Sequence, residues 1–406
     1  VNSTRSVRQS MRSVSSAQYG SGPIRLAIVT ETYVPDVNGV ANSLRQLLKA
    51  LDPEQFRIQI IRTRPREDWT PEHDEIWCRG VSIPMYPDLQ LGLPASGKIR
   101  HAWESFQPHI VYIATEGPLG ISARKEAQQR GLPVLSAFHT NFHRYSSFYG
   151  LGWVQTFTLN WLRRFHNRTA MTIVPSEDIA QNLRQDGFDN VRVLSHGVDC
   201  DLFHPRRRSA ALREQWQASE ATRVLLYVGR IAAEKNIPLA IDAWRALRDR
   251  GDNVRLVMVG DGPMRAELER EYPEIVFAGV QTGEMLARHY ASADMFLFPS
   301  QTETFGLVTL EAMASGLAVV AFPLAAAALH IRDGENGLLA ASCDDRAFIE
   351  SSLGILNQNV AVLRQNARKQ AEFASWKSIA DQFSVLINAE LVGSAATLQS
   401  TDKRMV

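Results

Sequence analysis

The sequence is poor in cysteine and has no long hydrophobic run. Its three cysteines, Cys78, Cys200 and Cys343, are far apart and fit no metal-ligand spacing, which argues against a disulfide or zinc framework and is typical of reduced cytoplasmic thiols. No stretch approaches the ~18 uninterrupted apolar residues of a membrane span, and the longest candidate is alanine-rich and broken by Pro323. We therefore expect a cytoplasmic protein that does not span a membrane.

The sequence also has almost no net charge, because 44 Lys and Arg oppose 43 Asp and Glu. This balance gives no reason to expect nucleic acid as a partner. The first 22 residues are rich in Ser and Arg, lack acidic residues and resemble a transit peptide, but they contain no apolar core of a secretory signal. We expect a disordered extension over 1–22.

What the sequence does contain is an alternation of short β-branched runs with longer helical segments. This alternation is typical of βαβ units on a parallel sheet, and at 406 residues two domains are expected. The pattern starts at Pro23, stops in a basic polar stretch, and restarts with RVLLYVGR. We predict an α/β protein with doubly wound domains over 23–200 and 221–375, a linker over 201–220, a helix over 376–392 that packs back towards the first domain, and a tail over 393–406.

Two such domains facing each other would form a cleft, because doubly wound sheets bind ligands at the carboxyl ends of their strands. In the first domain, the loop after the first strand contains Pro35 and Gly39 and leads into an amphipathic helix. That arrangement points free backbone amides at an anion, although a plain strand-to-helix turn explains it equally well. His139 and His143 follow the strand LPVLSAF, so we expect them at the cleft edge.

The segment WVQTFTLNWLRRFHNR has an apolar helical face and arginines elsewhere. The apolar face contains Val154, Phe157, Trp161, Leu162 and Phe165. Domain packing explains this face, and so does peripheral contact with a membrane surface.

In the second domain, Arg230 and Lys235 directly follow a buried strand. Two cations at a strand's carboxyl end could grip a diphosphate, whereas Arg230 could instead form a surface ion pair with Glu234. The spacing Asp199-Cys200-Asp201 occurs in some metal-dependent sugar transferases, but here we interpret it as a turn and predict no metal site.

The segment PSQTETFGLVTLEAMASG contains two glutamates that we expect to have hydrogen-bond or ion-pair partners. Glu303 lies in a loop at a strand end, and Glu311 interrupts an apolar helix. A carboxylate accepts hydrogen bonds from two vicinal hydroxyls, so each glutamate suits a sugar; an ion pair within the domain is the alternative for Glu311. An unpaired buried carboxylate would cost several kcal/mol.

Taken together, these motifs resemble the retaining glycosyltransferases of family 4, which have the two-domain GT-B fold. The matching segments, in order, are PDVNGVANSLRQL, HTNFH, SHGVDCDLFHP, VGRIAAEKN, VGDGP, FAGV and ETFGLVTLEAMASG. The pair of glutamates with seven residues between them is the most specific element. The resemblance covers nearly the whole chain from Arg25 to about Phe383.

The resemblance implies a role for each candidate residue. Arg230 and Lys235 would hold the leaving diphosphate, helped by the amides after Gly39. Glu303 would hold the donor hexose, and Glu311 would accept hydrogen bonds from the ribose.

Other positions would complete the donor site. The amides of Phe305, Gly306 and Leu307 would also hold the hexose, and the backbone at Gly279 and Val280 would read the base. His139 would contact the hexose near its primary hydroxyl and help to organise the reacting centre.

Within the family, HTNFHRYSSFYG looks most like GDP-mannose-dependent α-mannosyltransferases, so we expect GDP-mannose as donor, a lipid or glycan as acceptor, and no cofactor. UDP-glucose-dependent enzymes are the alternative. The chain departs from the family at Ser195-His196, where Asn or Arg often precedes GVD, and at Leu329, where glutamate is common. A non-catalytic nucleotide-sugar binding protein, an epimerase, a sugar phosphorylase and a dehydrogenase are competing readings; no G-x-G-x-x-G motif supports the last.

Overall fold

The computed structural model describes two compact units. The described residues are 22–36, 38–66, 68–83, 86–138, 152–301, 303, 305–341 and 343–402. Unit 1 contains the chain up to Ser195 and again from Ile379, and unit 2 comprises His196–Ser378.

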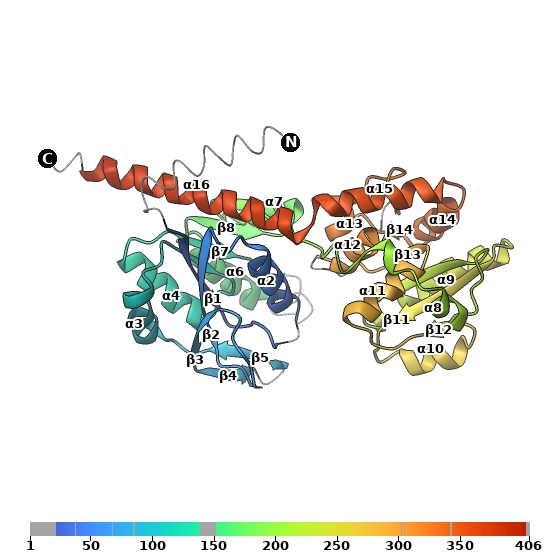
Figure 1. Cartoon of the computed structure of the whole chain (residues 1–406), viewed down its shortest axis with the longest axis horizontal. Helices are drawn as coiled ribbons and strands as arrows, with labels where there is room; N and C mark the ends of the chain where they lie inside the picture. The colour runs from blue at the N-terminus through green and yellow to red at the C-terminus, as the bar shows by residue number, and fades with distance from the viewer. Residues whose placement is uncertain are drawn as a thin grey trace. The chain divides into compact units, whose positions relative to one another are not determined.

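Unit 1 is built on a parallel seven-stranded sheet with the order β3-β2-β1-β6-β7-β8-β9 (Figure 1). Its strands are β1 (Ile24–Thr30), β2 (Phe56–Thr63), β3 (Asp74–Cys78), β6 (Ile110–Ile113), β7 (Val134–Ala137), β8 (Met171–Val174) and β9 (Val191–Val193). Its helices are α2 (Gly39–Ala50), α3 (Ser96–Phe106), α4 (Pro118–Gln129), α6 (Gly152–His166), α7 (Glu177–Gln185) and most of α16 (Trp376–Asp402). A separate antiparallel hairpin joins β4 (Gly80–Ile83) to β5 (Tyr86–Gly92). Because helices cover both faces of the parallel sheet, a central strand such as IRLAIVT is apolar along almost its whole length.

Unit 2 is built on a parallel six-stranded sheet with the order β12-β11-β10-β13-β14-β15. Its strands are β10 (Arg223–Val228), β11 (Val254–Val259), β12 (Val276–Phe277), β13 (Met295–Phe298), β14 (Ala318–Ala321) and β15 (Leu338–Leu339). Its helices are η1 (Pro205–Arg207), α8 (Ala210–Gln215), η2 (Ala233–Lys235), α9 (Ile237–Asp249), α10 (Arg265–Glu271), α11 (Gly283–Ser292), α12 (Leu307–Ala314), α13 (Ala325–His330), α14 (Asp345–Ile355) and α15 (Val360–Phe373). In both units the chain runs outward from the first strand on one side and then on the other, so the predicted doubly wound α/β fold is confirmed.

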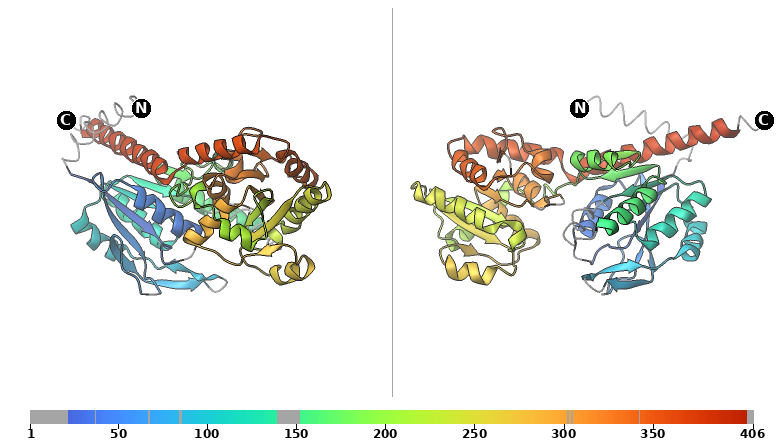
Figure 2. Two further views of the ribbon diagram at one scale, coloured as in Figure 1. Left: turned by 45° about the vertical axis from the view of Figure 1, so that its right-hand side comes forward. Right: turned by 180° about the vertical axis from the view of Figure 1, so that it is seen from behind.

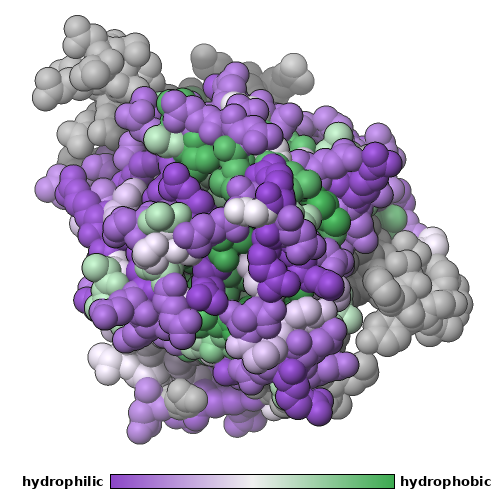
Figure 3. All heavy atoms as spheres, turned by 90° about the vertical axis from the view of Figure 1, so that its right-hand side faces the viewer, coloured by the Kyte–Doolittle hydropathy of each residue, from purple (hydrophilic) through white to green (hydrophobic). Residues whose placement is uncertain are grey.

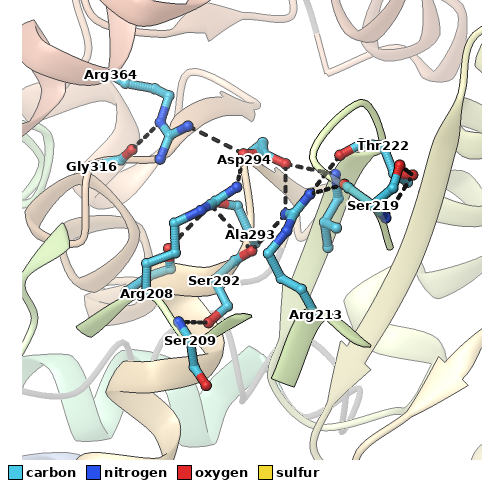
Figure 4. A network of polar contacts seen from close by, with 12 residues as sticks. Arg208, Ser209, Arg213, Ser219, Thr222, Ser292, Ala293, Asp294, Gly316 and Arg364 are labelled. Atoms are coloured by element: carbon cyan, nitrogen blue, oxygen red, sulfur yellow. Dashed lines mark hydrogen bonds and ion pairs between the residues drawn. The ribbon is translucent and has the colours of Figure 1, made fainter. Parts of the chain in front are cut away.

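The predicted linker over 201–220 is instead a packed part of unit 2, because a buried carboxylate holds it there (Figure 4). Asp294 is 1% exposed and accepts hydrogen bonds from Arg208 at 3.0 Å and from Arg213 at 3.1 Å, both within this segment. Arg364 of α15 reaches the same carboxylate at 3.2 Å, and the backbone amide of Val224 donates to it at 2.9 Å. These contacts, the Asp294 network, attach η1 and α8 to the start of β13.

The helix predicted over 376–392 is longer in the structure, since α16 runs to Asp402. Phe383 of α16 packs edge-on against Tyr112 of β6, with ring centroids 5.1 Å apart. Figure 2 shows α16 (red) alongside α7 and β8 of unit 1 from two further directions. Through Phe383, α16 therefore packs on the sheet of unit 1.

Two segments next to the unit boundaries lie against each other inside unit 2. The amide of Val198 donates to the carbonyl of Ala374 at 2.9 Å. A Cβ atom at Gly197 would lie 2.8 Å from the Cα of Trp376, so this approach requires glycine. Close packing against Trp376 thus explains the glycine of the SHGVD motif.

The face of the molecule shown in Figure 3 is mostly hydrophilic, with hydrophobic residues showing between the polar ones. None of the helices that the structure describes is both long enough and apolar enough to cross a membrane.

Candidate functional site

Three loops at the carboxyl edge of the unit 2 sheet are joined backbone to backbone. The amide of Gly229, after β10, donates to the carbonyl of Val259 at 3.0 Å, and the amide of Gly260, after β11, donates to the carbonyl of Gly279 at 2.8 Å. A Cβ atom at Gly260 would lie 1.9 Å from the carbonyl oxygen of Gly229. Gly260 is therefore required by this close approach, whereas Gly229 and Gly279 have φ +152° and +69°, a region that favours glycine.

Lys235 and Glu303 form an ion pair at this edge. The Nζ atom of Lys235, in η2, contacts Oε1 of Glu303, in the loop after β13, and their side chains are only 20% and 16% exposed. The hydroxyl of Ser300 donates to the same carboxylate oxygen at 2.9 Å. The two predicted residues thus come together across neighbouring strands although they are 68 positions apart in the chain.

Arg230 lies in the same loop as Lys235 and is oriented outward. Its guanidinium forms an ion pair with Glu234 at 3.2 Å and is 66% exposed, so the surface pair considered in the sequence is present. The buried hydroxyl of Tyr227 donates to the carbonyl of Arg230 at 3.0 Å. The backbone of Arg230 is therefore held while its long side chain remains at the surface.

Three of the predicted donor residues, Phe305, Gly306 and Leu307, lie at the start of α12. Gly306 has φ +78°, a conformation that favours glycine, and α12 begins at Leu307. The amides of a first helical turn have no partners within their helix, so they are available to an anion or a hydroxyl. Phe305 is buried, and its ring lies 4.6 Å from that of His196 and 6.4 Å from that of His330.

Neither of these two histidines was predicted as a site residue. His196 occupies one of the positions where the chain departs from the family pattern, and that departure was the available signal. His330 is buried, and desolvation lowers its pKa to about 4, so the ring is neutral at ordinary pH.

Glu311 has a partner that carries no charge. The hydroxyl of Tyr290, on α11, donates to Oε2 of Glu311 at 2.9 Å, and Glu311 forms no ion pair with any described residue. Burial raises the pKa of Glu311 to about 7, and the Tyr290 hydrogen bond opposes that rise. The ion pair proposed as an alternative for Glu311 is thus wrong for the described chain, and the carboxyl is poised to change its charge near neutral pH.

Gly279 and Val280 follow the edge strand β12. Gly279 has φ +69°, and the Val280 side chain is 67% exposed. Gln281 donates to the carbonyl of Ala278 at 2.7 Å and closes the turn. This places backbone groups of the turn at the same sheet edge as Lys235 and Glu303.

The two site residues predicted in the first domain have different outcomes. Gly39 is the first residue of α2, and Asn38 caps that helix by accepting from the amide of Ala41 at 2.9 Å. A Cβ atom at Gly39 would meet nothing within 4 Å, so packing within unit 1 does not require glycine here. His139 lies outside the described residues, and its predicted position stays a prediction.

Two carboxyl groups at the carboxyl edge of the unit 1 sheet were not predicted from the sequence. Glu31 follows β1 and accepts from the amide of Leu119 at 3.1 Å at the start of α4, and Glu116 follows β6. Burial raises the pKa of each to about 7. The repeated pair Thr-Glu after both strands, at Thr30 and Thr115, was a signal that could have found them.

No group of three or more potential metal ligands occurs among the described residues. Asp199 accepts hydrogen bonds from the amides of Asp201 and Leu202, at 3.1 Å and 2.9 Å, which confirms the turn predicted for this segment.

Comparison with known families identifies both halves of the chain. Residues 37–202 match the sequence model described as "Glycosyltransferase Family 4", and residues 222–358 match that described as "Glycosyl transferases group 1".

Relatives and solved structures agree with these matches. A GDP-mannose-dependent alpha-mannosyltransferase of Corynebacterium glutamicum is 30% identical over 89% of this chain and 86% of its own length. One of Mycobacterium tuberculosis is 34% identical over 73% of this chain and 79% of its own. The structure of a sucrose-phosphate synthase from Thermosynechococcus elongatus is similar with a TM-score of 0.68 and 20% identity, covering 90% of this chain and 98% of that one. The chain has the GT-B fold.

Proposed function

Because the chain belongs to glycosyltransferase family 4 and is a glycosyltransferase that uses a nucleotide-sugar donor, we propose that the donor is GDP-mannose and that transfer is retaining and metal-independent. The mannose and guanosine assignment is supported by the GDP-mannose-dependent relatives. The proposed acceptor is a hydroxyl group of a glycolipid or glycan, bound by unit 1. A relative named for phosphatidylinositol dimannoside as its acceptor supports a lipid.

The observation that supports the donor site is that both glutamates of one segment have a polar partner within unit 2. Lys235 holds Glu303, and Tyr290 holds Glu311. On this proposal the hydroxyls of the hexose and of the ribose take hydrogen-bond positions on these two carboxylates. Buried carboxyls would be costly without such partners.

The remaining donor contacts follow from the same edge. Phe305, Gly306 and Leu307 offer amides to the hexose, and the turn at Gly279 and Val280 lies at the end of β12, where the base would bind. From unit 1, Gly39 would let the diphosphate approach the start of α2, and His139 would contact the hexose near its primary hydroxyl.

In the proposed reaction the acceptor oxygen forms a bond to the anomeric carbon on the face from which the diphosphate departs. The bond between that carbon and the phosphate oxygen breaks, and the leaving phosphate accepts the proton of the acceptor hydroxyl. Negative charge therefore grows on the diphosphate. Lys235 and Arg230 stabilise that charge, and a fixed cation does so without the cost of reorganising water. Lys235 is the better placed because it is largely withdrawn from solvent.

The test is transfer of labelled hexose from GDP-mannose or UDP-glucose to a total lipid extract, with the anomeric configuration of the product determined by NMR. We expect a mannosyl product of retained α configuration, formed in the presence of a metal chelator. Transfer from UDP-glucose alone would overturn the donor assignment, and an inverted product would overturn the mechanism.

We also propose that unit 1 contacts a membrane through α6, where the acceptor would be a lipid. Phe157 is 72% exposed and Trp161 37% exposed, and with exposed Arg164 they form one stripe of the helix. Leu162 and Phe165 of the same helix are buried, so one side of α6 packs in the unit and the other meets solvent. Aromatic and basic residues on one helical face suit the interface of an anionic bilayer.

Sedimentation with phosphatidylglycerol vesicles tests this contact. The double variant Phe157→Ser, Trp161→Ser should bind vesicles at least about tenfold more weakly, because it loses two apolar side chains from the interface. The variant Phe373→Ser, which changes a 74% exposed side chain of unit 2, is the matched control and should bind as the wild type does. Equal binding of all three proteins would contradict the proposed contact.

A further inference from the structure

The two cations that we assign to the diphosphate each have a carboxylate partner in the structure. Arg230 forms an ion pair with Glu234, and Lys235 forms one with Glu303. The Arg230 pair is 66% and 46% exposed, so water screens it and its loss costs little. The Lys235 pair is only 20% and 16% exposed, so its two charges interact more strongly. A diphosphate that approaches Lys235 therefore competes with Glu303 for it.

Glu303 has a second partner that does not depend on Lys235. The hydroxyl of Ser300, which is 3% exposed, donates at 2.9 Å to Oε1, the same oxygen that Lys235 contacts. No described residue donates a hydrogen bond to Oε2. A Cβ atom at Gly306 would lie 3.8 Å from Cγ of Glu303, so this side chain lies beside the start of α12. The carboxylate therefore keeps a partner if Lys235 leaves, and Oε2 can accept from a sugar hydroxyl.

The ion pair of Lys235 and Glu303 carries no net charge, so it attracts a diphosphate only weakly while it is intact. If Lys235 turned to a diphosphate alone, the carboxylate of Glu303 would lose its cation beside a second negative group, which is costly away from solvent. A hexose changes this balance because its hydroxyls donate to Glu303 in place of Lys235. A nucleotide sugar supplies both new partners at once, whereas a free nucleoside diphosphate supplies only the anion.

We propose that Glu303 acts as a competing counter-ion of Lys235, which weakens binding of the nucleoside diphosphate product relative to the nucleotide-sugar donor. When the donor binds, Lys235 moves to the diphosphate and the hexose takes its place on Glu303. After transfer the hexose is gone, Glu303 pairs with Lys235 again, and the product leaves more readily. This inference rests on the proposed donor site, and it goes beyond that site by giving Glu303 a role in discrimination between donor and product.

The test is calorimetric titration of the full chain with GDP and with GDP-mannose, on the wild type and on Glu303→Gln. Glutamine keeps the size of the side chain and an oxygen that can accept from Ser300, but it has no charge to hold Lys235. We expect the variant to bind GDP about fivefold to tenfold more tightly, because Lys235 no longer has to leave a carboxylate. GDP-mannose should gain no affinity, since its hexose hydroxyls donate less strongly to an amide oxygen than to a carboxylate.

Two further variants show whether the gain acts through Lys235. Glu234→Gln removes the exposed carboxylate beside Arg230 and should change GDP affinity by less than about threefold. The double variant Lys235→Ala, Glu303→Gln should lose the gain in GDP affinity. An unchanged or weaker affinity for GDP in Glu303→Gln would overturn the proposal. Equal gains in Glu303→Gln and Glu234→Gln would also overturn it, because any lost negative charge would then explain them.

Titration of the same proteins with UDP and UDP-glucose separates this inference from the proposed donor. If only the uridine nucleotides bind and UDP gains affinity in Glu303→Gln, the GDP-mannose assignment fails while the counter-ion role stands. If GDP binds the wild type and Glu303→Gln equally, the counter-ion role fails while the donor site stands. Absence of binding by all four nucleotides would overturn both.

Discussion

The carboxyl edges of the two sheets share a topology and differ in what holds them. In unit 2, the loops after β10, β11 and β12 are joined through glycine backbones, and Lys235 lies against Glu303. In unit 1, the first glycine after β1 is Gly39, which begins α2, and the loop is joined to the start of α4 by the buried carboxyl of Glu31, which accepts from the amide of Leu119. A Cβ atom at Gly117 would lie 2.1 Å from that carboxyl.

The shared fold produces the same kind of sheet edge in both units, whereas the loops determine which polar groups lie at that edge. The edge of unit 2 has loops joined by backbone hydrogen bonds and a charged pair, which suits a ligand such as a nucleoside diphosphate sugar. The edge of unit 1 has the buried carboxyl of Glu31, which suits a different ligand. The predictions below separate these two edges, from the largest expected effect to the smallest.

Replacing Lys235 should have the largest effect. Lys235→Ala removes the withdrawn cation next to Glu303, and we expect kcat to fall by about a hundredfold to a thousandfold, because the charge on the leaving diphosphate loses its stabilisation. Steady-state kinetics with GDP-mannose measures this. Lys369→Ala, on the exposed side of α15, is the control, and a near-normal kcat for Lys235→Ala would refute the assigned role.

The second prediction concerns stability and the Asp294 network. Arg213→Ala leaves Asp294 buried with one partner fewer, and it also removes the hydrogen bonds to the carbonyls of Ser219 and Thr222. Breaking a buried ion pair costs about 3 kcal/mol, and we expect a loss of this order in the unfolding of unit 2. Urea unfolding followed by circular dichroism measures the loss. Arg184→Ala, in an exposed pair of unit 1, should cost less than about 1 kcal/mol; equal losses would mean that 201–220 contributes no more than a surface segment.

The third prediction uses the pKa of Glu311. Ribose hydroxyls donate best to a carboxylate, so GDP should bind more tightly as pH rises through about 7, the pKa that burial gives Glu311. Tyr290→Phe removes the hydrogen bond that lowers this pKa, so the variant should need a higher pH for the same affinity. At pH 7 we expect a loss of about threefold in affinity.

Calorimetric titration with GDP from pH 6 to 9, on the wild type and on Tyr290→Phe, measures the shift in the pH dependence of affinity. The phosphate of GDP also titrates in this range, but it affects both proteins equally. Phe203 and Phe296 pack against the Tyr290 ring and leave room for phenylalanine, so the variant should keep its fold. Superimposable pH profiles would show that Tyr290 does not position Glu311.

The smallest effect is expected in unit 1. Burial raises the pKa of Glu31 from 4.5 to about 7, so its contribution to stability is present below pH 4.5 and is lost as pH rises through 7. Glu31→Gln has no charge to bury, and at pH 8 we expect it to be about 0.5 kcal/mol more stable than the wild type. Thermal unfolding at pH 5 and pH 8 measures the difference. A variant less stable at pH 8 would mean that the carboxylate is stabilised where it lies.

The regular parts of the fold were predictable because their signals are local. After its exposed Arg223, the run RVLLYV is apolar and buried, which is what a strand covered on both faces requires. The packing of 201–220 in unit 2 was not predictable, because the partner of its arginines, Asp294, lies more than 80 positions further along the chain.

Site residues that belong to a sequence motif were predictable. Contacts that arise only from the packing of distant segments were not. Glu303 and Lys235 were found from their places after strands, and the structure brings them together. The Tyr290 partner of Glu311 lies 21 positions away on another helix, and no local pattern indicates it. Glu31 looks like an ordinary surface acid in the sequence, but it is buried in the structure.

The central claim is that the carboxyl edge of the unit 2 sheet binds the nucleotide of the donor, and GDP titration of the wild type and of Glu311→Ala tests it most directly. The account predicts that the wild type binds GDP more tightly than UDP or ADP. It also predicts that Glu311→Ala binds GDP at least about tenfold more weakly, because hydrogen bonds to a charged group are lost. An unchanged affinity for GDP in Glu311→Ala would contradict the account.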